Sequence, residues 1–211
     1  MPIILYVSMT ADGRVARAED SGGIPAVVLG DIMALVAQQG AMVLGRRTYE
    51  LFRDLGAVES IPGRIVVISR TLGATPGVEV AGSPAEGMDR LARDGLASAV
   101  LCGGAETYDS FLRLGVLDEM RLNILPALMG RGPRLADWDD PLALTLVGSA
   151  DLGEGIVQLR YRGSRRRRRL AHHTNPLSLN YAVSPMGCSP FNNPLAARRA
   201  PYPPRWPIRT A

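Results

Sequence analysis

The sequence predicts an α/β domain in which helices cover both faces of a mainly parallel sheet. Short apolar runs alternate with stretches of helical pattern up to about residue 115, and such alternation is typical of parallel strands joined by helices. Two of these runs end in glycine and lead straight into a helical pattern, at residues 43–49 and 99–108. After residue 115 three strand-like runs follow without helices between them, so we expect an antiparallel edge.

In the first half of the chain, Pro2–Ser8 is an apolar run suited to a buried strand, and Met9–Gly13 is a turn signal. The charged, glycine-containing stretch 14–23 predicts a loop. Pro25 suits the first turn of a helix that runs to Gln39, with Gly40 as its stop. The next predicted elements are a strand Ala41–Leu44, a helix Arg47–Arg53, a strand Arg64–Ser69 and a weaker strand Val78–Ala81.

In the second half, Ser83 stands three residues before Glu86, which predicts a capped helix that extends to about Asp94. A strand at Ala99–Cys102 and a helix at Glu106–Leu114 follow, and Gly115 ends that helix. The predicted strands that close the domain are Glu119–Leu125, Ala143–Ser149 and Ile156–Arg162.

The distribution of charge divides the chain into a domain, residues 1–163, and a tail, residues 164–211. The domain holds all 20 acidic residues and 15 arginines, whereas the tail holds 9 arginines and no acid. The tail is also rich in proline, asparagine and serine and has no hydrophobic period, so we expect it to be disordered. Nonspecific binding to nucleic acid or an anionic membrane is the alternative to a merely solvated extension.

Several function classes find no support in the residues. Cys102 and Cys188 are too differently placed for a disulfide framework, and no zinc-ligand spacing occurs. Both histidines, His172 and His173, lie in the tail, so the domain has no histidine base and no metal cluster. No apolar stretch has the length of a membrane span or the pattern of a secretion signal, so we expect a cytoplasmic protein without a membrane partner.

Residues suited to a phosphorylated ligand follow several predicted strands. Arg46 and Arg47 come directly after Gly45, and a second strand ends in Ser69-Arg70-Thr71. Gly103-Gly104 begins a helix, where backbone N–H groups and the helix dipole favour an anion. Each motif alone also has a purely structural explanation. Arg46 and Arg47 could lie on a solvated helix face, Ser69–Thr71 could be an ordinary loop, and Gly103-Gly104 could be a tight turn. Because carboxyl ends of parallel strands share one edge, together they predict a dinucleotide site that favours NADP over NAD.

Candidates for acid–base chemistry are few, which suits hydride transfer because there the cofactor carries the reaction. Asp12 and Asp31 are the carboxylates nearest the predicted cleft. Asp12 has the alternative of making an Asp-Gly turn. Asp31 has the alternative of an exposed helix face.

The motifs resemble a known superfamily. Val43–Glu50, Ile65–Thr71 and Cys102–Leu112 resemble the three cofactor segments of dihydrofolate reductases. Ser8–Ala16, Gly115–Glu119, Ile124–Gly132 and Gly153–Val157 look closer to the reductase domain of riboflavin biosynthesis, the C-terminal half of the bifunctional deaminase-reductase. The resemblance spans about residues 1–162 and implies a dihydrofolate reductase-like three-layer sandwich.

The resemblance also implies residue roles. It places NADPH phosphates against Gly45, Arg46, Arg47 and Thr48, and the adenosine 2′-phosphate against Ser69 and Arg70. It places the pyrophosphate and the nicotinamide side of the cofactor against Gly103, Gly104, Ala105, Glu106 and Thr107. It places the substrate against Ser8, Thr10 and Asp12, and Pro126 and Gly130 at the rim of the substrate site. Asp12 is the catalytic candidate.

The implied activity is NADPH-dependent hydride transfer to a small heterocyclic substrate. The substrate that the resemblance favours is 5-amino-6-(5-phosphoribosylamino)uracil or its diamino-pyrimidinone analogue. The sequence leaves open whether the protein forms a homodimer. Two alternatives remain: a folate or pterin reductase, and a non-catalytic nucleotide-binding protein. Folate reductases carry an acid on the first helix, but the matching stretch Ile24–Val27 has none and Asp31 lies one turn later. The riboflavin branch has glutamate where this chain has Cys102, and Gly-Thr-Val where it has Arg47-Thr48-Tyr49.

Overall fold

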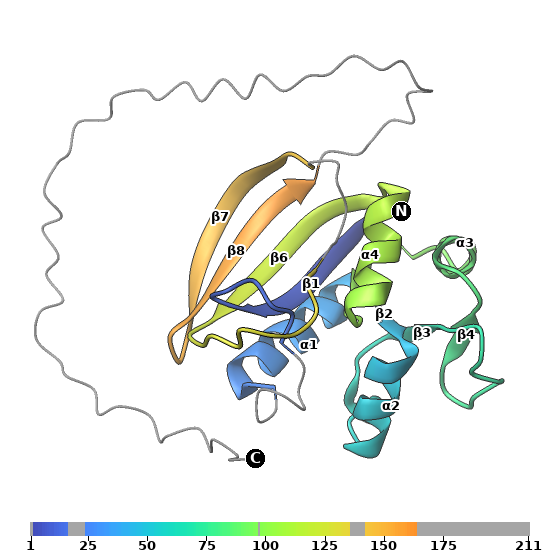
Figure 1. Cartoon of the computed structure of the whole chain (residues 1–211). Coiled ribbons are helices and arrows are strands. Elements are labelled where there is room, and N and C mark those ends of the chain that lie inside the picture. The colour runs from blue at the N-terminus through green and yellow to red at the C-terminus, as the bar shows by residue number, and fades with distance from the viewer. Residues whose placement is uncertain (1, 17–23, 97, 136–141, 164–211) are drawn as a thin grey trace, which may run out of the picture. The chain divides into compact units, whose positions relative to one another are not determined.

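The computed structural model describes residues 2–16, 24–96, 98–135 and 142–163. The predicted tail 164–211 and most of the predicted loop 14–23 lie outside these residues. Within them, an eight-stranded sheet has the order β4-β3-β2-β5-β1-β6-β8-β7 (Figure 1).

The sheet is parallel from β4 to β6. At its C-terminal edge, β8 runs antiparallel to both β6 and β7. This arrangement confirms the predicted mainly parallel sheet with an antiparallel edge. The strands are β1 (Ile3–Thr10), β2 (Ala41–Gly45), β3 (Arg64–Ile68), β4 (Glu79–Ala81), β5 (Ala99–Leu101), β6 (Leu117–Leu125), β7 (Leu144–Gly153) and β8 (Ile156–Gly163).

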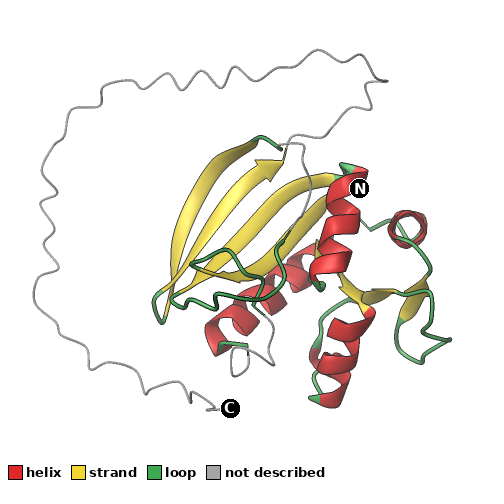
Figure 2. Ribbon diagram, viewed as in Figure 1, coloured by secondary structure: helices red, strands yellow, loops and turns green. Residues whose placement is uncertain are grey.

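Helices cover both faces of the sheet and make three layers (Figure 2). One core cluster joins the sheet to α1 (Ala26–Gln39) and α2 (Arg46–Asp54), and a second joins it to α3 (Pro84–Arg93) and α4 (Ala105–Leu114). A short 3-10 helix, Val58–Ser60, follows α2. Alternate residues of β1 belong to opposite clusters, as the pleat of a strand requires.

The predicted helix ends depend on glycine and serine. Gly40 and Gly115 adopt the left-handed conformation, with φ of 85° and 65°, and donate their N–H groups to Val36 and Leu112. The Ser83 side chain accepts a hydrogen bond from the Glu86 N–H at 3.2 Å, which caps α3.

Several strand boundaries differ from the prediction. β1 continues through Thr10, two residues past the expected end at Ser8, because its last residues pair with β6 as far as Leu125. β7 runs to Gly153 rather than Ser149, because it forms a long hairpin with β8. The β1 extension arises from pairing between distant segments, which a local pattern does not report, whereas the β7 extension arises from pairing with the next strand in the chain.

Candidate functional site

A cavity of about 910 Å³ lies at the carboxyl ends of β1, β2, β3 and β5. This edge is where open α/β sheets bind ligands. It brings together the whole predicted cofactor set and one predicted substrate residue. These lining residues are Ser8, Gly45, Arg46, Arg47, Thr48, Ser69, Arg70, Gly103, Gly104, Ala105, Glu106 and Thr107.

Two of the glycines are required by close packing. A Cβ on Gly45 would clash with Thr107 Oγ1, and a Cβ on Gly103 would lie 2.8 Å from Thr107 Cβ. The Thr107 side chain therefore fits between the end of β2 and the start of α4 only because both positions lack a side chain. This packing brings the first turns of α2 and α4 to the same cavity.

The third glycine has open space where a side chain would stand. A Cβ on Gly104 would meet only Thr48 Oγ1, at 3.9 Å. Gly104 and Gly45 are the N-caps of α4 and α2, and neither helix start has a side-chain cap. The first N–H groups of both helices are thus left for another acceptor, and together with the helix dipoles they favour an anion.

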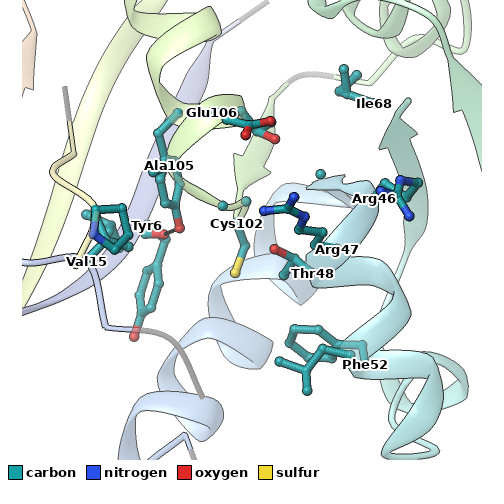
Figure 3. Close-up of a pocket in the computed structure, with 18 of the residues that line it drawn as sticks. Tyr6, Val15, Arg46, Arg47, Thr48, Phe52, Ile68, Cys102, Ala105 and Glu106 are labelled. Carbon is teal, nitrogen blue, oxygen red and sulfur yellow. Dashed lines mark hydrogen bonds between the residues drawn. The ribbon is translucent and has the colours of Figure 1, made fainter. Parts of the chain in front are cut away.

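Three arginines line the cavity, Arg46, Arg47 and Arg70, and they differ in their ion-pair partners. Arg46 Nη1 donates to Glu50 Oε1 at 2.8 Å across one helical turn, so its charge is already paired. Arg47 and Arg70 are exposed and form no ion pair with another described residue. In Figure 3, Arg47 and Thr48 lie on the side of the pocket nearest Cys102, whereas Arg46 lies farther away.

Ser69 holds the loop that carries Arg70. Its Oγ accepts the N–H groups of Thr71 at 3.1 Å and Leu72 at 2.9 Å. Both bonds use the oxygen, so the hydroxyl hydrogen remains available to an acceptor. This places a hydroxyl donor next to a guanidinium at the end of β3.

Part of the lining of the cavity is apolar. It includes side chains from α1, α2 and the end of β6: Val28, Leu29, Ile32, Leu51, Phe52 and Leu125. Cys102 also lines the cavity, and burial raises the pKa of its thiol to about 12, so it stays protonated at neutral pH. Burial likewise raises the pKa of Tyr6, with a further contribution from the Asp31 charge.

Four predicted substrate residues are not among the described residues that line the cavity: Thr10, Asp12, Pro126 and Gly130. Asp12 instead connects two loops. Its carboxylate accepts hydrogen bonds from Thr10 Oγ1 at 2.5 Å, Met129 N at 3.2 Å and Gly130 N at 2.7 Å. These bonds lower the pKa of Asp12 to about 2, with Thr10 as the largest cause. A catalytic role for Asp12 stays a prediction.

Two buried amides that are not among the predicted site residues, Asn123 and Gln158, lie next to Ser8 at the cavity. Gln158 on β8 joins Asp31 on α1 to Asn123 on β6 by hydrogen bonds of 2.8 and 3.0 Å. Asp31 is half-buried, so the alternative of an exposed helix face is wrong. The sequence does hold a sign of this contact, because Asn123 and Gln158 each place an amide side chain within an otherwise core-forming strand.

The described residues include no cluster of three or more side chains suited to a metal ion. Among the described helices none is long and apolar enough to cross a membrane.

Comparison with known proteins identifies relatives of this arrangement. The model of the family described as RibD C-terminal domain matches residues 2–158. The protein YyaP of Bacillus subtilis is 37% identical over 62 residues, which cover 29% of this chain and 33% of that relative. The match thus spans about a third of the curated relative.

Solved structures share the fold. A protein of Shewanella sp. PV-4 assigned to riboflavin biosynthesis superimposes with a TM-score of 0.66 at 21% identity, over 78% of this chain and 100% of that one. RibD of Acinetobacter baumannii gives 0.60 at 20%, over 78% and 58%. Dihydrofolate reductase of Schistosoma mansoni gives 0.55 at 17%, over 78% and 99%. The sheet and its layers are therefore those of the dihydrofolate reductase-like fold.

Proposed function

The chain belongs to the RibD C-terminal domain family, and from this premise we propose that it is an NADPH-dependent reductase of the riboflavin-biosynthesis type. The observation that carries the proposal is the convergence of three separate phosphate-suited segments on one cavity. Those segments are Gly45–Thr48, Ser69–Arg70 and Gly103–Thr107. Each one alone is compatible with an ordinary turn or helix start, whereas their shared cavity suits a ligand with several phosphates.

The glycine positions support the fit of a dinucleotide. The side of Gly104 on which a Cβ would stand is open, so its backbone is accessible to a phosphate. The uncapped first turns of α2 and α4 supply N–H donors, and Arg47 and Thr48 supply a guanidinium and a hydroxyl. When bound, the nicotinamide cofactor supplies the hydride. The residues of this chain bind and orient it.

We assign the adenosine 2′-phosphate to Ser69 and Arg70. The Ser69 hydroxyl hydrogen has no acceptor among the described residues, and Arg70 is exposed without a described ion-pair partner. Arg46 is the weaker candidate because Glu50 already pairs with it. This assignment supports NADPH rather than NADH as the cofactor.

The substrate that we propose is a ribosylaminopyrimidine phosphate, 5-amino-6-(5-phosphoribosylamino)uracil or its diamino analogue. Ser8 faces the cavity directly. Asp12 would act on the substrate through the two loops that it joins. Val15 and Pro133, a few residues farther along these loops, line the cavity, and the Val15 N–H donates to the Pro133 carbonyl at 2.9 Å. Thr10, Pro126 and Gly130 would shape the same rim.

The proposal is tested by titrating the purified protein with NADPH and NADH and then measuring NADPH oxidation with each candidate substrate. Because a hydrogen bond to a charged group contributes about 1.5–3 kcal/mol, we expect Arg70→Ala to weaken NADPH binding roughly 10- to 150-fold. NADH binding should change little, and Arg113→Ala on the far end of α4 is the matched control.

Each outcome separates the candidate functions. Turnover of the ribosylaminopyrimidine phosphate supports the proposal. Robust turnover of dihydrofolate would identify a folate reductase, which we do not expect because the α1 residues that line the cavity are apolar. NADPH binding without turnover of either substrate would favour a non-catalytic nucleotide-binding protein.

A further inference from the structure

A chain of hydrogen-bonded side chains runs from α1 across β8 and β6 to β1 and ends at the cavity. Gln158 Nε2 donates to Asp31 Oδ2 at 2.8 Å and to Asn123 Oδ1 at 3.0 Å. Asn123 Nδ2 in turn donates to Ser8 Oγ at 3.4 Å. Asn123 and Gln158 are 0% and 3% exposed, so water does not compete for these bonds.

The carboxylate at one end decides the direction of every bond in the chain. A carboxylate only accepts hydrogen bonds, so Gln158 must turn its amide nitrogen toward Asp31. That nitrogen carries two hydrogens, and the second reaches the Asn123 oxygen. Asn123 must then present its own nitrogen to Ser8. A reversed Gln158 amide would place its oxygen against the Asp31 carboxylate, and a reversed Asn123 amide would place two amide nitrogens against each other in a buried site.

The consequence falls on the Ser8 hydroxyl. Because its oxygen accepts from Asn123, its hydrogen is left for a different acceptor. The other hydroxyl groups of β1 are differently engaged: Tyr6 donates to the Val28 carbonyl at 3.2 Å and Thr10 donates to Asp12 at 2.5 Å. Among the described residues of β1, Ser8 is therefore the hydroxyl that offers a donor to the cavity.

We infer that Asp31, Gln158 and Asn123 are positioning residues that hold Ser8 as a hydrogen-bond donor to the substrate. This inference rests on the proposed reductase function and refines its substrate class. The substrate presents an acceptor to Ser8, either a carbonyl oxygen or an unprotonated ring or imine nitrogen. A compound with only an N–H at that point would leave the Ser8 hydroxyl hydrogen without an acceptor and bind less well.

A double-mutant cycle with Ser8→Ala and Asp31→Asn tests the inference in the full-length chain. The assay is NADPH-dependent turnover of 5-amino-6-(5-phosphoribosylamino)uracil. Loss of one hydrogen bond should lower kcat/KM of Ser8→Ala about three- to tenfold. Asp31→Asn keeps the shape but releases the amide orientation, so it should lower kcat/KM by a smaller factor. The double variant should be no worse than Ser8→Ala alone.

Two controls keep the result specific. NADPH affinity should stay within about twofold of wild type in all variants, since none of these residues belongs to the phosphate side. Asp89→Asn, an exposed acid on α3, should change neither property. Unchanged kcat/KM in Ser8→Ala, or fully additive losses in the double variant, would overturn the inference.

A structural readout tests the chain of bonds independently of turnover. In the wild-type protein, NMR should show nuclear Overhauser contacts from the Asn123 side-chain amide hydrogens to the Ser8 β-hydrogens. In Asp31→Asn these contacts should weaken because Asn123 is free to turn. Their absence in the wild type would overturn the inference even if the enzyme is active. Their presence in a protein without turnover would support the positioning and refute only the proposed function.

Discussion

Asp12 shows how a carboxylate near a cavity can hold two loops together. Thr10 and two backbone N–H groups, of Met129 and Gly130, surround its carboxylate. Three donors stabilise the charged form, which is why the pKa of Asp12 falls to about 2. The Asp-Gly turn that the sequence offers as an alternative role is thus accompanied by a bridge to a loop more than a hundred residues away.

This environment predicts a specific dependence of stability on pH. The pKa of Asp12 is lower in the folded state than its ordinary value of 3.8, so its contribution is complete above about pH 4 and is lost as the pH falls toward 2. Asp12→Asn should therefore destabilise the protein at pH 7, and the difference from wild type should shrink between pH 4 and pH 2. Urea unfolding at several pH values measures this. A difference that is independent of pH would show that the carboxylate charge is not what stabilises the loops.

The glycines at the cavity predict opposite outcomes for similar substitutions. Gly104→Val should leave a folded protein, because only Thr48 Oγ1 lies within 4 Å of the added Cβ, but the side chain should block the phosphate path and abolish NADPH binding. Gly103→Val is the matched comparison. Its Cβ would press against Thr107, and such overpacking costs about 1–3 kcal/mol of stability.

Thermal melts measure the stability of both variants, and NADPH titrations measure their cofactor affinity. A Gly104→Val protein that melts like wild type and still binds NADPH would remove this glycine from the proposed site. A Gly103→Val protein of full stability would show that Thr107 moves aside without penalty.

At the scale of elements, much of the fold could be predicted because its signals are local. Gly40, Gly115 and Ser83 mark helix ends through their own backbone or side-chain chemistry. The C-terminal extension of β1 as far as Thr10 could not be predicted, because it depends on pairing with β6, more than a hundred residues later. The sequence there resembles a turn, and partner strands override that preference.

The same distinction explains the candidate site. Segments placed at strand ends, such as Gly45–Thr48 and Gly103–Thr107, could be predicted to converge because parallel strands share an edge. The long-range contacts of a side chain could not be predicted, and the hydrogen bonds that Asp12 accepts from Met129 and Gly130 are an example. The contacts of Asn123 and Gln158 join separate strands, so only their polar character in the core could have indicated them.

The helices offer a matched pair of glycines for a stability prediction. Gly30 lies in the second turn of α1, is exposed and has nothing within 4 Å of an added Cβ. Gly30→Ala should stabilise the protein by about 0.5–1 kcal/mol through the higher helix propensity of alanine. Gly115 ends α4 with φ of 65°, where a Cβ costs about 1–2 kcal/mol.

Urea unfolding of Gly30→Ala and Gly115→Ala measures both effects. We expect shifts of the unfolding midpoint in opposite directions and unchanged NADPH affinity. A stabilising Gly115→Ala would mean that the end of α4 adopts another conformation in solution.

At the scale of the whole molecule, the cavity depends on segments from much of the chain. Its walls include Tyr6 on β1, Val28 on α1, Phe52 on α2 and Tyr108 on α4. Helices from both faces of the sheet therefore contribute to one site (Figure 1). A ligand that contacts all these walls binds the folded chain far better than the unfolded one, so its binding free energy adds to the stability of the domain.

This linkage predicts that NADPH raises the melting temperature. At a free concentration of about 100 times its Kd, a ligand stabilises the folded state by about 2.7 kcal/mol, which for a domain of this size is a shift of roughly 5–10 °C. NADH at the same concentration should give a smaller shift, because the Ser69 hydroxyl and the Arg70 guanidinium have no 2′-phosphate to bind. In Arg70→Ala the NADPH shift should fall to the NADH value, and in Gly104→Val both shifts should disappear. Equal shifts for the two cofactors in the wild type would show that the end of β3 does not recognise the 2′-phosphate.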